Sequence, residues 1–186
     1  MVSLTALWLP IVLSAVIVFI ASSILHTIFK YHHKEIRPIP EEDKVLALLR
    51  NVGLRRGIYI FPHCKHGKEM KSPEMIEKYQ QGPVGMVTVF KSGSPAMGKF
   101  LGLWFAFCLI ISFFVAYLAG HTIEFGAPYL GVFRVVGTAA FLAYGLGQLS
   151  NGIWKGQPWS AVIKEVADGL LYGLLTAGVF GWLWPR

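Results

Sequence analysis

The sequence predicts an all-α membrane protein: a bundle of four transmembrane helices with a small α+β insertion on the cytoplasmic side, between the first and the second span. Of the 186 residues, 54% are apolar and only 15% are charged. The apolar residues gather in four stretches of about 20 residues, the length at which a helix crosses the ~30 Å hydrocarbon layer. An aromatic content of 14% argues against a disordered chain, and two cysteines are too few for a disulfide scaffold.

The spans divide the chain into three parts. We expect a first span in residues 1–29, a basic cytoplasmic module in residues 30–98 and a three-span bundle in residues 99–186. A cleaved signal peptide is the alternative for the first span. No charge precedes that apolar run, however, and the run exceeds the ~7 to 15 residues of a signal-peptide core, so a retained anchor is favoured. The four apolar stretches cover residues 4–29, 100–119, 129–149 and 162–184.

The distribution of charge predicts the orientation of the chain. Residues 30–99 hold 13 of the 17 Lys and Arg and 7 of the 10 acidic residues, so this segment carries +6 of the formal net charge of +7. Basic connections stay on the cytoplasmic side, which places both termini outside. We therefore expect a multi-pass protein of a prokaryotic cytoplasmic (inner) membrane whose basic segment meets anionic lipid headgroups. No recognition helix or RNA-binding signature is found, so nucleic acid is not an expected partner.

Small residues recur at four-residue spacing in three spans, as they do where transmembrane helices pack closely. These stripes predict contacts within the chain, and the second span has two of them, so one face could receive a membrane-protein partner or a second copy. The stripe of the fourth span consists of Gly169, Gly173, Ala177 and Gly181. The others are Gly98, Gly102 and Ala106; Cys108, Ser112, Ala116 and Gly120; and Ala139, Ala143 and Gly147.

The basic segment carries alternating signals for helices and strands. Acidic residues after Pro40 open a helix that ends near Gly53, and Ser72 opens a second helix that runs to about Gln81. Residues 58–61 and 84–90 have the composition of strands. Such a short segment builds a marginal core, so we expect it to rest on the membrane surface, on the bundle or on another protein.

The segment His63-Cys64-Lys65-His66 is the sharpest candidate for a metal centre. Two imidazoles and a thiol within four residues suit zinc or copper, although the spacing matches no established zinc pattern. His32 and His33 could complete the ligand set if the chain folds back. Nearby lysines leave two alternatives open, a reactive thiol at Cys64 and an exposed polar loop.

Three polar residues within the predicted spans are further candidates, because ionisable groups inside a bilayer are costly. We expect His26 to hydrogen-bond a neighbouring helix. Arg134 lies near the outer end of the third span, where it can reach the interface or pair with Glu124. Asp168 places a carboxylate at a helix contact near the cytoplasmic boundary, and a proton or cation site is the alternative to a structural role there.

Catalytic signals are scarce. The sequence has no nucleotide fingerprint, nucleophile elbow or phosphate-binding loop. The segment Tyr31-His32-His33-Lys34, where the first span ends, is typical of an interfacial anchor. The leading hypothesis is therefore a non-enzymatic accessory, assembly or interaction component. A small transporter or metal-handling protein using residues 63–66 and Asp168 is the first alternative. A membrane-embedded enzyme is the second, and it would require Asp168 to meet His32 and His33.

Overall fold

The computed structural model describes residues 1–32 and 35–186 and is mostly helical. Three helical segments are long and apolar enough to cross a membrane, which supports the prediction of a helical membrane protein: Leu4–Thr27, Met97–Thr122 and Tyr129–Lys155. The fourth predicted span corresponds to α7 (Trp159–Trp182), which is not among the three. Its first ten residues include Lys164, Glu165 and Asp168, and a fourth crossing stays a prediction.

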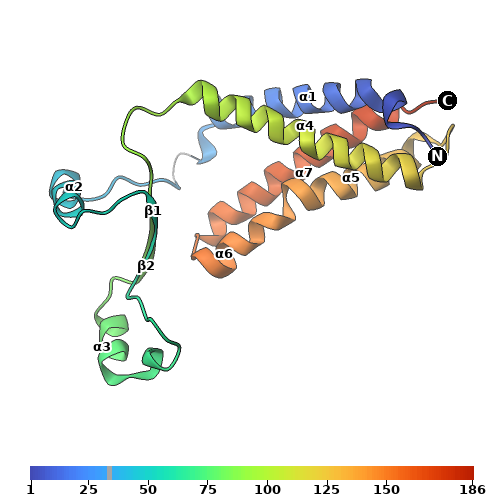
Figure 1. The fold of residues 1–186 in the computed structure, drawn as a ribbon. Helices are drawn as coiled ribbons and strands as arrows, with labels where there is room; N and C mark the ends of the chain where they lie inside the picture. The colour runs from blue at the N-terminus through green and yellow to red at the C-terminus, as the bar shows by residue number, and fades with distance from the viewer. Residues whose placement is uncertain (33–34) are drawn as a thin grey trace. The chain divides into compact units, whose positions relative to one another are not determined.

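The chain forms two compact units (Figure 1). We name residues 1–36 and 96–186 the helical unit, and residues 37–95 the insertion unit. The helices of the helical unit are α1 (Trp8–Thr27), α4 (Met97–Thr122), α5 (Tyr129–Tyr144), α6 (Leu149–Lys155) and α7. Short 3-10 turns extend or join them at Leu4–Leu7, Lys30–His32 and Leu146–Gln148.

The insertion unit pairs two strands in an antiparallel hairpin and adds two helices, close to where the sequence predicts them. The elements are α2 (Glu42–Asn51), β1 (Gly57–Phe61), the 3-10 turn Glu69–Lys71, α3 (Pro73–Gln81) and β2 (Gly85–Val89). The Ser72 hydroxyl caps α3 by accepting from the Met75 N–H. Gly82 ends this helix with a φ of 60°, which favours a residue without Cβ. Among residues 37–95, all of them described, only Met75 is buried, so the core is marginal.

The closest helix contact lies between α5 and α7 and depends on glycine. A methyl group built on Gly169 would overlap the backbone of Gly145. One built on Gly173 would lie 3.1 Å from the Phe141 nitrogen. Further along α7, Ala177 faces α5 and Gly181 lies against the ring of Tyr129. The small-residue stripe of α7 is therefore the surface on which α5 packs.

The two small-residue faces of α4 differ in burial. Cys108, Ser112, Ala116 and Gly120 are buried, and the Ser112 hydroxyl lies 3.0 Å from the Ser14 hydroxyl of α1. Gly98 and Gly102, on the other face, are exposed, and apart from their own stretch of helix backbone no described atom lies within 4 Å of the place where their Cβ would stand.

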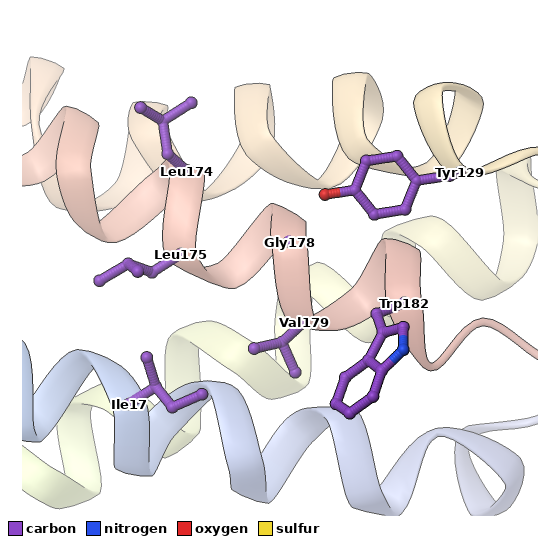
Figure 2. A pocket seen from close by; sticks show the side chains of 7 residues that line it. All are labelled: Ile17, Tyr129, Leu174, Leu175, Gly178, Val179 and Trp182. Carbon is purple, nitrogen blue, oxygen red and sulfur yellow. The ribbon is translucent and has the colours of Figure 1, made fainter.

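An apolar groove of about 470 Å³ opens among α1, α5 and α7 (Figure 2). No charged side chain lines it, and in a bilayer such a surface faces acyl chains. We therefore assign it no binding site. Its lining residues are Ile17, Tyr129, Leu174, Leu175, Gly178, Val179 and Trp182.

The glycine contact predicts a position-specific effect of one added methyl group. Gly169→Ala should lower the thermal unfolding midpoint in detergent, because α5 and α7 must separate at an overpacking cost of about 1 to 3 kcal/mol. Gly178→Ala is the matched control in the same helix, since its new Cβ would meet only the Tyr129 hydroxyl at 3.8 Å. The control should be neutral or stabilising, because alanine favours a helix by up to about 1 kcal/mol over glycine. Equal midpoints for the two variants would contradict the described contact.

Candidate functional site

Polar side chains converge where α1 ends and α7 begins. After α1, the turn Lys30–His32 brings two side chains to α7. Asp168 accepts from both: the Tyr31 hydroxyl donates to its Oδ1, and His32 Nε2 lies 2.9 Å from its Oδ2. The whole group, which we call the α1–α7 cluster, consists of His26, Tyr31, His32, Glu35, Lys164, Glu165 and Asp168.

Glu35 and Lys164 extend this arrangement. His32 Nδ1 lies 2.9 Å from Glu35 Oε2, so the imidazole stands between two carboxylates. Lys164 Nζ lies 2.7 Å from Glu35 Oε1 and donates to the backbone oxygen of Tyr31 at 2.8 Å. One lysine thus neutralises a carboxylate and also holds the backbone of the turn that presents His32.

The electrostatics of the cluster favour an ion-paired state. Burial lowers the pKa of His32, but the hydrogen bonds to Glu35 and Asp168 outweigh it and hold that pKa above its usual value. Burial raises the pKa of Glu35, and the bonds from Lys164 and His32 reverse this and hold it below its usual value. Burial and the hydrogen bond to Asp168 raise the pKa of Tyr31, which stays a neutral donor.

His26 joins the cluster through its ring. Its Nδ1 lies 2.9 Å from the Ser22 carbonyl oxygen, which can only accept, so we assign the ring proton to Nδ1 and a free lone pair to Nε2. The His26 and His32 rings stack, with centroids 4.8 Å apart and planes 6° apart. The partner of His26 is thus its own helix and a neighbouring ring, whereas the sequence predicts a hydrogen bond to another helix.

The cluster also contains an unsatisfied acceptor. Glu165 lies one turn before Asp168 on α7, near enough to Glu35, His32 and Asp168 to interact electrostatically with them. Its Oε2 is buried and accepts no hydrogen bond from the described part of the chain. A buried carboxylate oxygen without a donor is costly, and it marks a place suited to a cation or a water molecule.

Tyr31 and His32 turn toward α7, whereas the sequence predicts that they anchor the chain at the membrane interface. The His32 side chain is 14% exposed and lies against Asp168. An embedded enzyme would require this meeting of His32 with Asp168, but His33 and Lys34 lie outside the described residues. The sequence did not identify Glu35 or the role of Lys164. The signal that could have found them is Asp168, an acidic residue in an apolar span that needs a partner.

The cysteine-histidine segment of the insertion unit is a different environment. His63 and His66 are exposed, and Cys64 Sγ lies 3.6 Å from the Tyr79 hydroxyl. Within residues 1–32 and 35–186, the group whose potential ligand atoms gather is His26, His32 and Asp168. A metal centre at His63, Cys64 and His66 stays a prediction.

Arg134 lies apart from the α1–α7 cluster. It is exposed on α5 and lines an apolar groove of about 410 Å³ with Leu118 and Leu142. None of the ion pairs formed by the described residues includes Arg134, so the predicted partner Glu124 does not neutralise it here. Of the three intramembrane candidates, the structure therefore brings together His26 and Asp168.

No protein-family model, curated protein or solved structure matches the chain. The function must therefore be inferred from the chemistry of the cluster and of the insertion unit. The α1–α7 cluster can exchange protons or hold a cation, and it ties the turn after α1 to α7.

The contact between His32 and Asp168 predicts an energetic coupling. A double-mutant cycle of His32→Ala and Asp168→Ala, followed by unfolding in detergent and chelator-treated buffer, should give a coupling free energy of about 1 to 3 kcal/mol, because each single change leaves a buried partner unpaired. His121 bonds only its own helix, at the Tyr117 carbonyl oxygen, and serves as the control. The cycle of His121→Ala with Asp168→Ala should be additive. Additivity in both cycles would show that the described ion pair does not form.

Proposed function

We propose that the chain is a multi-pass protein of a prokaryotic cytoplasmic membrane and acts as a non-enzymatic accessory or assembly component. In this proposal α7 supplies the fourth crossing, both termini lie outside, and residues 37–95 lie in the cytoplasm. The insertion unit is its interaction surface. The exposed apolar face of the hairpin supports this assignment, because its side chains need another surface to cover them.

The hairpin presents large apolar side chains on one face. Its register pairs Ile58 with Thr88 and Ile60 with Met86, and residues directly opposite each other project from the same side. Ile58 is 70% exposed and Ile60 is 51% exposed. Phe90, directly after β2, is 80% exposed. Contiguous exposure of such residues marks an interaction surface.

Cations surround one end of this apolar face. Arg55 and Arg56 precede β1, and Lys91 follows β2; all three are exposed. The pairing of Gly57 with Val89 places them at the same end of the hairpin. Lys91 stands six residues before Met97, where α4 begins, so the chain itself keeps this end near the bilayer surface.

We infer that the covering surface is the anionic inner face of the bilayer. Apolar side chains enter the headgroup boundary while neighbouring cations meet phosphates, and each cation near the surface contributes about 1 kcal/mol. The insertion unit would then lie on the membrane, where it can reach other membrane proteins. A protein partner that covers the same face is the competing outcome of the test.

Docking can be measured on the full chain in lipid nanodiscs. A fluorophore on Ser92→Cys, in a Cys64→Ser background, should be quenched by headgroup spin-labelled lipid more strongly when phosphatidylglycerol is present. Changing Arg55, Arg56 and Lys91 to Gln should remove most of that difference, because about 3 kcal/mol of attraction is lost. Changing Lys65, Lys68 and Lys71 to Gln removes the same charge at the opposite end of the hairpin and should leave quenching nearly unchanged.

Two results would overturn lipid docking. Quenching that is the same with and without phosphatidylglycerol would indicate that a protein or the bundle covers the hairpin. Equal loss in both triple variants would indicate a general charge effect without a defined docking end.

The orientation can be tested with the native thiols. Cys108 is fully buried and Cys64 is partly exposed, so a membrane-impermeant maleimide should react at Cys64 alone. We expect labelling in inverted membrane vesicles and none in intact cells. Cys64→Ser should abolish labelling, and Cys108→Ser should leave it unchanged. Labelling of Cys64 in intact cells would reverse the proposed topology.

A further inference from the structure

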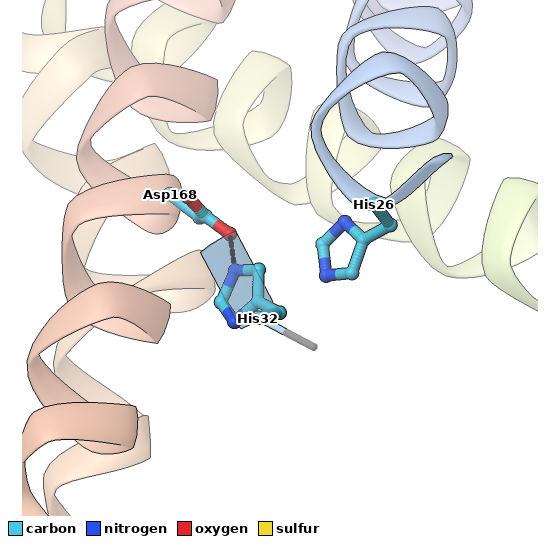
Figure 3. A group of neighbouring side chains, drawn as sticks. All are labelled: His26, His32 and Asp168. Carbon is cyan, nitrogen blue, oxygen red and sulfur yellow. Dashed lines mark hydrogen bonds and ion pairs between the residues drawn. The ribbon is translucent and has the colours of Figure 1, made fainter. Parts of the chain in front are cut away.

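We infer that His26, His32 and Asp168 form a binding site for one divalent transition-metal ion of the zinc class. The site lies between the end of α1 and the start of α7, far in sequence from the cysteine-histidine segment of residues 63–66. It does not depend on the accessory role proposed above. Figure 3 shows the two imidazole rings side by side, with the carboxylate of Asp168 at His32.

The ligand chemistry selects the class of metal. Two imidazole nitrogens and one carboxylate oxygen form a three-residue set that zinc accepts, with water or another group in the fourth position. Calcium and magnesium prefer oxygen ligands throughout, and copper(I) prefers sulfur. Neither preference is met by two histidines and one aspartate.

In both imidazoles Nε2 is the nitrogen that is available to a metal. His26 Nδ1 is held by the Ser22 carbonyl oxygen, and His32 Nδ1 faces Glu35 Oε2 at 2.9 Å. A hydrogen bond at one ring nitrogen fixes the tautomer that offers the other nitrogen to a metal. Glu35 is thus a positioning residue for His32, and Lys164 holds Glu35 in turn.

The distances suit a site that closes around an ion. The ligand atoms of the three residues lie within 4.8 Å of one another. Around a tetrahedral zinc with bonds of about 2.1 Å, neighbouring ligand atoms stand about 3.4 Å apart. His26 is exposed at the end of α1, so rotation of its side chain out of the stack with His32 can supply both the shorter distance and the change of ring orientation. At Asp168, the ion takes the place of the His32 Nε2 proton, which leaves to solvent.

The charge balance allows a dication. Lys164 stays paired with Glu35, and the His32 imidazole is neutral once its Nε2 proton has left, so Asp168 is the negative ligand of the ion. Glu165 belongs to the same cluster, and its buried Oε2 has no donor among the described residues. The cluster therefore offers three ligands, two hydrogen bonds that leave Nε2 of each histidine available, and a buried acceptor without a donor at Glu165.

Zinc binding should be measured on the full chain, purified in detergent through an affinity tag without histidine, stripped with chelator, re-equilibrated with Zn²⁺ and freed of unbound metal. We expect one Zn²⁺ per chain by elemental analysis, and Co²⁺ should give the visible absorption of a four-coordinate nitrogen-oxygen site. His26→Ala should weaken zinc binding at least 100-fold and abolish the Co²⁺ signal. It should keep the wild-type unfolding midpoint in chelator, because His26 is exposed. Glu35→Gln should weaken binding 10- to 100-fold and keep the stoichiometry.

The matched control is the double change His63→Ala with His66→Ala, which removes two imidazoles from the insertion unit and should leave zinc binding unchanged. Loss of zinc in this control but not in His26→Ala would transfer the metal to the cysteine-histidine segment and overturn our inference. Absence of zinc from the wild-type chain would overturn it as well. Docking to anionic lipid is measured separately, so failure of the metal site leaves that proposal standing.

Discussion

The backbone contact between α5 and α7 is the constraint on which the polar architecture depends. Gly169 stands against the backbone of Gly145, with no room for a side chain on α7. Because an α-helix turns by about 100° per residue, burial of Gly169 against α5 fixes the direction of the preceding Asp168 toward the end of α1. It also fixes Tyr172, one turn later, whose ring meets Tyr144 with centroids 5.6 Å apart. A bulkier residue at position 169 would therefore displace the carboxylate of Asp168 as well as the helix.

In lipid no hydrophobic effect drives the helices together, so individual hydrogen bonds contribute to holding the helices of the helical unit in place. The Ser14 and Ser112 hydroxyls join α1 to α4, and the Trp104 indole nitrogen donates to the Ser22 hydroxyl at 2.7 Å. The hydroxyls of Tyr144 and Tyr172 are buried and have no hydrogen-bond partner within the described ranges. Tyr172 is close enough to Asp168, and Tyr144 to Ser112, for electrostatic interaction, so polar groups continue from the α1–α7 cluster into the bundle.

Local signals in the sequence predicted the local structure. The Ser72 cap, the two strands and the α7 stripe depend on neighbours a few residues apart, so composition and spacing reveal them. The α1–α7 cluster depends on a contact across 136 residues, and the pattern around Tyr31 and His32 looks like an ordinary interfacial anchor. The α5 stripe shows a second limit. Spacing favoured Ala143 and Gly147, which are exposed, whereas Gly137 and Gly145 face α7; periodicity finds a small-residue face but does not say which face meets a neighbour.

The cluster and the proposed docking surface share one stretch of chain. The segment that presents Tyr31, His32 and Glu35 to α7 is the connection to the insertion unit, which begins at Arg37. Contacts from Asp168 and Lys164 hold that connection against α7 before it leaves the helical unit. A cation between His32 and Asp168 would tighten the same attachment. Lipid binding by the hairpin needs only its own apolar face and cations. In the proposed function, the cluster therefore fixes where the connection starts, and the hairpin determines where the insertion unit rests.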